Sequence, residues 1–211
     1  MKITWIGHSC FKVEKDGCTI LLDPYGDGSV PGLAPVRERA NMVLCSHEHG
    51  DHNARDKVEI VEAERSPFTV TRMETYHDDE KGAKRGRNII HIISDNEMRI
   101  AHLGDLGCEP DAEQIKQLMG LDAVLIPVGG FYTINAVQAA KLVESIRPGA
   151  VIPMHYRSDE KGFGFGVIGT VDPFMEQMKD VMVIPTSELD LATTKDMPGT
   201  VFVLQPQNAG R

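Results

Sequence analysis

The feature that most constrains this chain is a group of metal-binding side-chain types packed into six consecutive residues. Residues 46–52 read Ser-His-Glu-His-Gly-Asp-His, and the candidate ligands are His47, His49, Asp51 and His52. A short apolar run precedes them and a polar segment follows, which is typical of a loop at the end of a buried strand. Imidazoles this close repel one another once protonated, whereas a divalent cation requires neutral imidazole and ionised carboxylate. The segment therefore predicts a metal site, with a solvated His-rich loop as the alternative.

The spacing of these ligands indicates two metal ions. One catalytic zinc ion takes three protein ligands and leaves a position open for water. His47 and His49 can face one ion, while the adjacent pair Asp51 and His52 faces another. Two ions then need about two or three further ligands, which we expect downstream.

Three later residues have the same placement, directly after an apolar strand. They are His77, Asp105 and His155. Gly104 allows the backbone to turn tightly and bring the Asp105 carboxylate close to the site. His77 is flanked by Asp78 and Asp79, which are alternative ligands. Together with the first group, these residues make seven candidate ligands, enough for two ions that share Asp105.

The rest of the chain predicts strands first, then strands alternating with helices. We expect strands at residues 2–6, 11–14, 19–22, 57–63, 68–75, 88–93, 98–102, 123–126, 150–152, 181–184 and 200–204. We expect helices at residues 111–119, 136–146 and 173–178. This order favours an α/β (α+β) sandwich in which helices cover two central sheets. No repeat or linker divides the chain, so residues 1–211 are expected to form a single domain.

Charge and composition narrow the expected partners. The 22 Lys and Arg residues against 31 Asp and Glu residues give a net charge of −9, which argues against nucleic acid. No apolar run approaches the ~18 residues of a membrane helix, and the N-terminus does not resemble a signal peptide. The four cysteines show no paired spacing and are expected to be reduced thiols in a cytoplasmic protein. We therefore expect a small-molecule substrate, no nucleic acid and no membrane, and homo-oligomer formation stays open.

The motifs resemble the metallo-β-lactamase fold. Residues 47–52 match its HxHxDH motif, and His77, Asp105 and His155 match its later ligands in chain order. Four segments extend the resemblance to a branch of small hydrolases similar to L-ascorbate-6-phosphate lactonase: residues 5–11, 22–24, 102–105 and 127–133. The resemblance covers nearly the whole chain and is specific for the fold and the metal site but not for the substrate. It implies a four-layer αββα sandwich with the metals at one edge, between the sheets.

The same resemblance assigns the ligands. It implies that the first metal is held by His47, His49 and His77, and the second by Asp51, His52 and His155, with Asp105 bridging. It also gives Asp51 a proton-shuttling role, which makes this residue the candidate catalytic group.

Four further side chains are expected to position ligands or contact the substrate. His8 ends the first strand in a Gly-His-Ser turn, where it either serves the site or caps the strand end. His102 precedes Asp105 by three residues and is expected to orient a ligand or the loop. Tyr132 and Tyr156 are candidates to donate a hydrogen bond to a developing oxyanion, with ordinary boundary tyrosines as the alternative.

Other features have simpler explanations. His91 lies within an apolar strand and is expected to be structural, as is the Cys108 thiol. The basic run at residues 81–87 lacks a P-loop pattern and is expected to form a solvated hairpin. The Gly-rich segment at residues 162–166 is either a lid, whose phenylalanines cover the substrate, or a static loop.

Two metal ions about 3.5–4 Å apart generate hydroxide from a bridging water at neutral pH and polarise the oxygen under attack. The sequence thus predicts hydrolysis of an ester, lactone or phosphoester bond in a small anionic substrate. Zinc is the first choice of metal, and manganese or iron also suits nitrogen and oxygen ligands. The alternatives are a mononuclear iron thiol dioxygenase on the same fold and a non-catalytic metal-binding protein.

Overall fold

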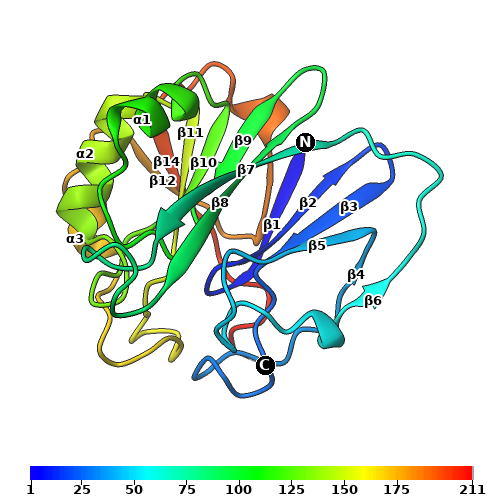
Figure 1. Cartoon of the computed structure of the whole chain (residues 1–211), viewed down its shortest axis with the longest axis horizontal. Helices are drawn as coiled ribbons and strands as arrows, with labels where there is room; N and C mark the ends of the chain where they lie inside the picture. The colour runs from blue at the N-terminus through cyan, green and yellow to red at the C-terminus, as the bar shows by residue number, and fades with distance from the viewer. Residues whose placement is uncertain (211) are drawn as a thin grey trace.

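Two β-sheets face each other in the computed structural model, which describes residues 1–210 (Figure 1). The first sheet has the order β13-β1-β2-β3-β5, formed by Glu188–Asp190, Lys2–Gly7, Cys10–Lys15, Cys18–Leu22 and Met42–Leu44. Alternate residues of its strands point into the core, so Ile3 and Trp5 lie opposite Val13 and Phe11, all fully buried. The sequence predicted these strands from their β-prone residues and from the turn residues that separate them.

The second sheet has the order β12-β14-β11-β10-β9-β8-β7. Its strands are Val181–Val183, Thr200–Val203, Ala150–Met154, Ala123–Pro127, Arg99–His102, Arg87–Ser94 and Thr69–Tyr76. The strands from β12 to β9 run parallel, whereas β7, β8 and β9 are antiparallel. Every residue of β10 and β11 is buried, as their continuous apolar sequences predict for central parallel strands.

Three α-helices cover the outer face of the second sheet (Figure 1): α1 (Ala112–Leu118), α2 (Ala136–Ile146) and α3 (Asp172–Met175). Asn135 caps α2 as expected, because its side chain accepts a hydrogen bond from the Gln138 N–H at 3.0 Å. The third helix is shorter than the expected residues 173–178.

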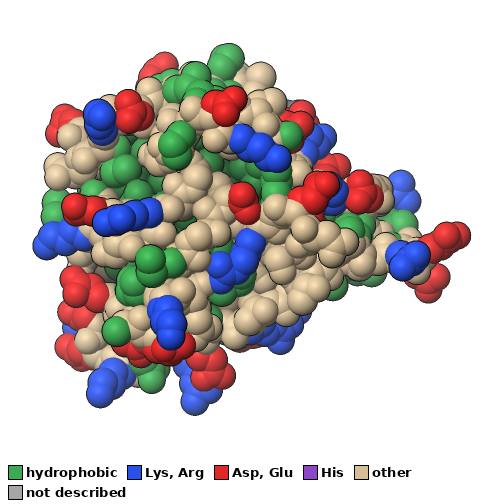
Figure 2. All heavy atoms as spheres, turned by 90° about the horizontal axis from the view of Figure 1, so that it is seen from above, with side chains coloured by type: hydrophobic (Ala, Val, Ile, Leu, Met, Phe, Trp, Pro, Cys, Tyr) green, Lys and Arg blue, Asp and Glu red, His purple; other side chains and the backbone are tan. Residues whose placement is uncertain are grey.

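The outer face of the first sheet carries extended segments, and among residues 1–210 no α-helix lies over it. Half-buried Lys12 on this face pairs with Glu38 at 3.1 Å. Figure 2 shows acidic and basic side chains interspersed over one face of the molecule. The mixed α/β sandwich is therefore as predicted, but its α-helical cover lies on one side.

The main departure from the predicted elements is the strand expected at residues 57–63. The chain forms instead the 3₁₀ turn η1 (Arg55–Lys57) and the two-residue strand β6 (Glu59–Ile60), which pairs with β4 (Arg39–Ala40). Ile60 is 60% exposed, so this β-prone residue has no core surface to pack against. The short β13 and the 3₁₀ turn η2 (Leu191–Thr194) were also not predicted.

Buried apolar side chains from both sheets form one continuous core cluster. Among residues 1–210, none of the helices has the length and apolar character that crossing a bilayer requires. Strands β1, β3, β5, β7, β9 and β11 are each followed within a few residues by a His or Asp, and these side chains meet at one edge of the sandwich.

Candidate metal centre

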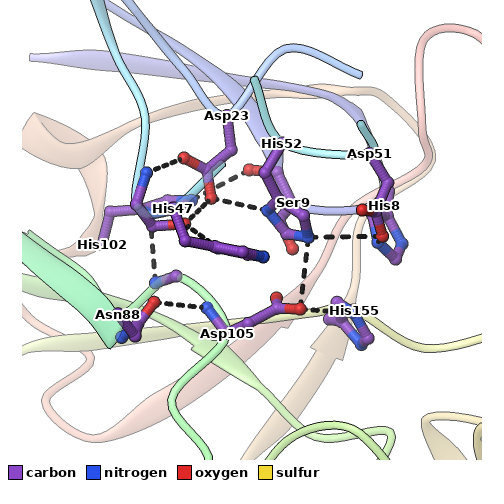
Figure 3. Close-up of polar contacts among 12 residues, drawn as sticks. His8, Ser9, Asp23, His47, Asp51, His52, Asn88, His102, Asp105 and His155 are labelled. Carbon is purple, nitrogen blue, oxygen red and sulfur yellow. Dashed lines mark hydrogen bonds and ion pairs between the residues drawn. The ribbon is translucent and has the colours of Figure 1, made fainter. Parts of the chain in front are cut away.

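The structure gathers all seven predicted ligands and His8 into one group, here called the metal cluster. Its members are His8, His47, His49, Asp51, His52, His77, Asp105 and His155. They come from the loops that follow strands of both sheets. Figure 3 shows the labelled members lying close together: His8, His47, Asp51, His52, Asp105 and His155. Three sets within the cluster bring their ligand atoms within 4.8 Å of one another.

The first set is His47, His49 and His77, the residues expected to hold the first ion. The ring centroids of His47 and His49 lie 4.6 Å apart, and those of His47 and His77 lie 4.7 Å apart. His47 and His77 are buried, whereas His49 is exposed. His77 therefore occupies the expected place, and the neighbouring Asp78 turns into the β7–β8 hairpin, where it accepts backbone hydrogen bonds.

The second set contains Asp51, His52 and His155, and it includes His8 as a fourth member. The Oδ2 atom of Asp51 lies 3.4 Å from Nε2 of His8 and 3.5 Å from Nε2 of His52. The rings of His8 and His155 are 4.2 Å apart between centroids. His8 thus lies within this group of candidate ligands, whereas its turn suggested a residue that positions a ligand or contacts the substrate.

Asp105 lies between the two sets. Its Oδ2 atom is 3.4 Å from Nε2 of His77, 3.2 Å from that of His52 and 3.1 Å from that of His155. Gly104 is essential to this placement, because it adopts a φ of +56° and an added Cβ would lie 2.4 Å from the Ser46 side chain. One carboxylate oxygen therefore contacts imidazoles from both sets.

Asn88 fixes the backbone of this loop. Its Oδ1 accepts the Asp105 N–H at 2.9 Å, and its Nδ2 donates to Thr75 Oγ1 and to the Leu103 carbonyl. Asn88 is fully buried, and no local sequence pattern indicates this role.

Asp23 supports the cluster from behind and was also missed as a functional residue. Its Oδ2 accepts hydrogen bonds from the Ser46 hydroxyl at 2.5 Å and from Nδ1 of His52 at 2.8 Å, and its Oδ1 accepts the Ser46 N–H (Figure 3). Because the Ser46 hydroxyl donates to Asp23, it accepts from Nδ1 of His47 at 2.9 Å. Both His47 and His52 then present an unprotonated Nε2 to the cluster when neutral, the arrangement that metal-binding histidines need.

The electrostatics of the cluster favour a bound cation. Burial, reinforced by neighbouring imidazoles, lowers the pKa of His47 to about 3 and that of His8 to about 4, so both are neutral at pH 7. Burial also disfavours the His52 cation, yet the carboxylates of Asp105, Asp23 and Asp51 raise the pKa of His52 well above its ordinary value. Burial would raise the pKa of Asp105, but His155 and His52 hold it well below its usual range. A bound metal ion would replace the proton of the His52 cation and supply the positive charge that these carboxylates stabilise.

Unsatisfied polar atoms provide a test of whether the residues fit a metal. Among residues 1–210, several buried ring nitrogens and one carboxylate oxygen of the cluster have no hydrogen-bond partner, including Nε2 of His8, His47, His52 and His155 and Oδ1 of Asp105. Each such atom costs about 1–3 kcal/mol when left unpaired. Divalent cations would accept these lone pairs, and imidazole nitrogen with carboxylate oxygen is a donor set suited to zinc, manganese or iron.

A cavity of about 390 Å³ opens beside the cluster. It is lined by Ser29, His49, Gly50, Asp51, His77, Arg85, Asp105, Tyr132, His155 and Phe165. Tyr132 thus lies where the sequence placed it, on the wall of the site. We call this space the metal-site cavity.

Other predicted residues lie outside the cavity. His102 donates from Nε2 to the Ser9 carbonyl at 2.9 Å and accepts the Gly104 N–H at Nδ1, so it orients the Asp105 loop. The structure corrects the expectation for Tyr156: its ring is buried against Trp5, 5.3 Å between centroids, and it lines a different cavity. His91 is buried in β8, and Cys108 lines a cavity beside α2, so neither belongs to the metal cluster.

The Gly-rich segment at residues 162–166 is tied to the body of the protein. Phe163 is buried and packs on Trp5, 5.9 Å between ring centroids, and the Gly164 N–H donates to the Pro31 carbonyl at 2.9 Å. Phe165 is only partly buried and lies 5.4 Å from the His8 ring. The two phenylalanines are therefore not equivalent: Phe163 belongs to the core, and only Phe165 can cover a substrate.

A two-sheet sandwich with His and Asp side chains at one edge defines a metallo-β-lactamase type of fold. The chain belongs to the β-lactamase superfamily, because the family model described as "Beta-lactamase superfamily domain" matches residues 2–155. The predicted fold and superfamily are thereby confirmed, and the branch similar to L-ascorbate-6-phosphate lactonase stays a prediction.

Several relatives and solved structures agree with this assignment. A UPF0173 metal-dependent hydrolase from Methanopyrus kandleri is 29% identical over 194 residues, covering 74% of this chain and 84% of the relative. A second one, from Pyrobaculum neutrophilum, is 30% identical over 193 residues, covering 75% of this chain and 85% of the relative. A candidate Zn-dependent hydrolase of the metallo-β-lactamase superfamily from Thermotoga maritima superposes with a TM-score of 0.73 at 27% identity, covering 97% of this chain and 99% of that chain. The metallo hydrolase Igni18 from Ignicoccus hospitalis shares the fold with a TM-score of 0.64 at 20% identity, covering 99% of this chain and 96% of that chain.

Proposed function

We propose that the protein is a binuclear metal-dependent hydrolase that cleaves an ester, lactone or phosphoester bond in a small anionic substrate. The observation that carries this proposal is the position of Asp105, whose Oδ2 contacts imidazoles of both ligand sets. In this proposal His47, His49 and His77 hold the first ion. Asp51, His52 and His155 hold the second beside His8, and Asp105 is shared. The relatives named as metal-dependent hydrolases support the reaction class.

Two divalent ions, when bound, lower the pKa of water and polarise the oxygen that is attacked. Zinc is the first choice, with manganese and iron as alternatives. The charge of two such ions exceeds that of the Asp51 and Asp105 carboxylates, so the cavity would attract an anionic substrate although the whole chain has a net charge of −9. A lactone or phosphoester of a small anion fits a cavity of about 390 Å³.

Asp51 is the carboxylate placed to move a proton. Its side chain is 20% exposed and lines the cavity, whereas Asp105 is 2% exposed and surrounded by three imidazoles. Burial would raise the pKa of Asp51, but His52 and His8 beside its Oδ2 hold it well below its usual range, so it is ionised at neutral pH. It can accept a proton at Oδ1, the oxygen that these two histidines do not engage, and pass it to the leaving oxygen. Tyr132 lines the same cavity and can donate a hydrogen bond to the substrate.

The test is turnover by the metal-loaded protein on a panel of lactones, sugar phosphates and phosphodiesters. We expect hydrolysis of at least one class, which a chelator abolishes and added metal restores, and which Asp105→Ala abolishes. Absence of turnover on every substrate with both sites loaded would favour a binding protein. One iron per chain with thiol-dependent oxygen consumption would favour the dioxygenase.

A further inference from the structure

A single basic side chain lies on the wall of the metal-site cavity. Arg85 is the one Lys or Arg among the lining residues, and the carbon at the centre of its guanidinium lies 5.4 Å from the centroid of the Tyr132 ring. This distance is typical of a cation–π contact, which holds a planar guanidinium by its face and leaves its edge donors available. The cavity therefore has a second positive group besides any metal ions.

The backbone that carries Arg85 is held rigidly. Asp78, at the start of the hairpin between β7 and β8, is buried and accepts four backbone N–H groups, including that of Arg85 at 2.7 Å and that of Lys84 at 3.0 Å. Asp78 also follows the candidate ligand His77 directly, so the hairpin fixes Arg85 relative to the cluster.

Arg85 differs from the two nearest basic residues, Lys84 and Arg87, because no acidic group pairs with it within residues 1–210. Lys84 pairs with Glu80 at 2.7 Å, and Arg87 lies 3.5 Å from Glu74. Within residues 1–210 Arg85 forms no ion pair, although it is partly buried. A partly buried guanidinium without a carboxylate partner at the wall of a cavity is suited to bind an anion.

We propose that Arg85, held against Tyr132, binds an anionic group of the substrate, a carboxylate or a phosphate, at a distance from the bond that is cleaved. This inference rests on the proposed function, because it places the reacting bond at the metal cluster and the anionic group at Arg85 on the cavity wall. The acidic residues that line the cavity, Asp51 and Asp105, belong to the ligand sets. Arg85 would thus select substrates that carry a second negative charge away from the bond that is cleaved.

The experiment measures binding to the metal-loaded protein and requires no turnover. Isothermal titration calorimetry compares the affinities of dicarboxylates from malonate to adipate with those of monocarboxylates of equal carbon number. The series of chain lengths is used because the distance between the metal ions and Arg85 is not fixed in advance. At one chain length the wild type should bind the dicarboxylate about tenfold or more tightly, because a charge-assisted bond to arginine is gained. Phosphonocarboxylates of the same lengths show whether a carboxylate or a phosphate group is preferred.

Arg85→Gln should remove the preference for two anionic groups and leave monocarboxylate affinity and metal content within about twofold of the wild type. Arg85→Lys should restore part of the preference, since it keeps the charge but loses the planar donors. Arg87→Gln, a matched change in the same hairpin, should leave both affinities unaltered.

Three outcomes overturn the proposal. They are a wild type without preference for any dicarboxylate or phosphonocarboxylate, a preference that persists in Arg85→Gln, and an equal loss of mono- and dicarboxylate binding, which would mean that Arg85 acts on the metal site. Failure of the hydrolase proposal would appear separately, as absence of turnover.

Discussion

Replacing Asp23 by asparagine should weaken the metal centre although Asp23 is not one of its candidate ligands. The carboxylate is fully buried and accepts three hydrogen bonds, from the Ser46 N–H at 2.7 Å, the Ser46 hydroxyl at 2.5 Å and Nδ1 of His52 at 2.8 Å. Burial favours its protonated form, but His102, His52 and Ser46 hold the pKa of Asp23 well below its usual range. It therefore orients His52 directly and His47 through Ser46.

The magnitude follows from what an amide can accept. Asparagine keeps the shape of Asp23 but has one acceptor oxygen, so at least one of the three donors faces an NH₂ group. An unsatisfied buried donor costs about 1–3 kcal/mol of unfolding free energy. Loss of the partner that orients a ligating histidine typically weakens metal affinity by about 10–100-fold, equivalent to about 1.4–2.7 kcal/mol.

Chelator competition at pH 7 measures the metal affinity, and urea unfolding of the metal-free protein measures stability. Asp95→Asn is the matched control, because Asp95 accepts the Glu97 and Met98 N–H groups at 2.7 Å in the β8–β9 turn and does not contact the cluster. It should alter stability without changing metal affinity by more than about twofold. Wild-type metal affinity in Asp23→Asn, or an equal loss in Asp95→Asn, would refute this account of the hydrogen-bond chain.

Three further predictions follow from the site and the core. Asp51→Asn, assayed in excess metal, should retain much of its metal but lose about 10²-fold or more in kcat as a proton carrier is lost; a near wild-type rate would redirect the search to Tyr132. Burial lowers the pKa of His91 from 6.5 to about 4, so the unfolded chain binds more protons and the metal-free protein loses stability as the pH falls through that window. Between pH 7 and pH 5, the free energy of unfolding measured in urea should fall by about 2 kcal/mol less in His91→Leu than in the wild type. An unchanged pH profile in the variant would contradict the lowered pKa of His91. Phe165→Ala should change KM or kcat at unchanged metal content, whereas Phe163→Ala should instead cost about 3–5 kcal/mol of stability; unaltered kinetics for Phe165→Ala would leave a static wall.

The candidate metal ligands could be predicted from the sequence because each one has a local signal. Every predicted ligand follows an apolar strand, and side chains at the ends of neighbouring strands meet at one edge of a sheet. The glycine before Asp105 carried a second signal, and its positive φ confirms the tight turn. The α2 helix was predicted to the residue, since Asn135 and Pro148 mark its two ends.

The supporting residues could not be predicted because their partners are distant in the sequence. Asp23 bonds to His52 across 29 positions and Asn88 to Asp105 across 17. Asp23 lies in one of the segments that carry the resemblance, residues 22–24, but the local sequence of neither residue identifies its distant partner. Tyr156 misled for the opposite reason, since adjacency to a ligand suggested proximity. The left-handed backbone of His155, with a φ of 52°, turns the chain there, and the Tyr156 ring packs into the core against Trp5.

The number of metal ions per chain tests the central claim most directly. Elemental analysis of the purified protein after metal loading and removal of excess metal should give close to two divalent ions per chain. Asp105→Ala should reduce the occupancy of both sites, because Asp105 contacts imidazoles of both sets. A single iron ion per loaded chain, or full occupancy in Asp105→Ala, would contradict a binuclear centre that shares this carboxylate.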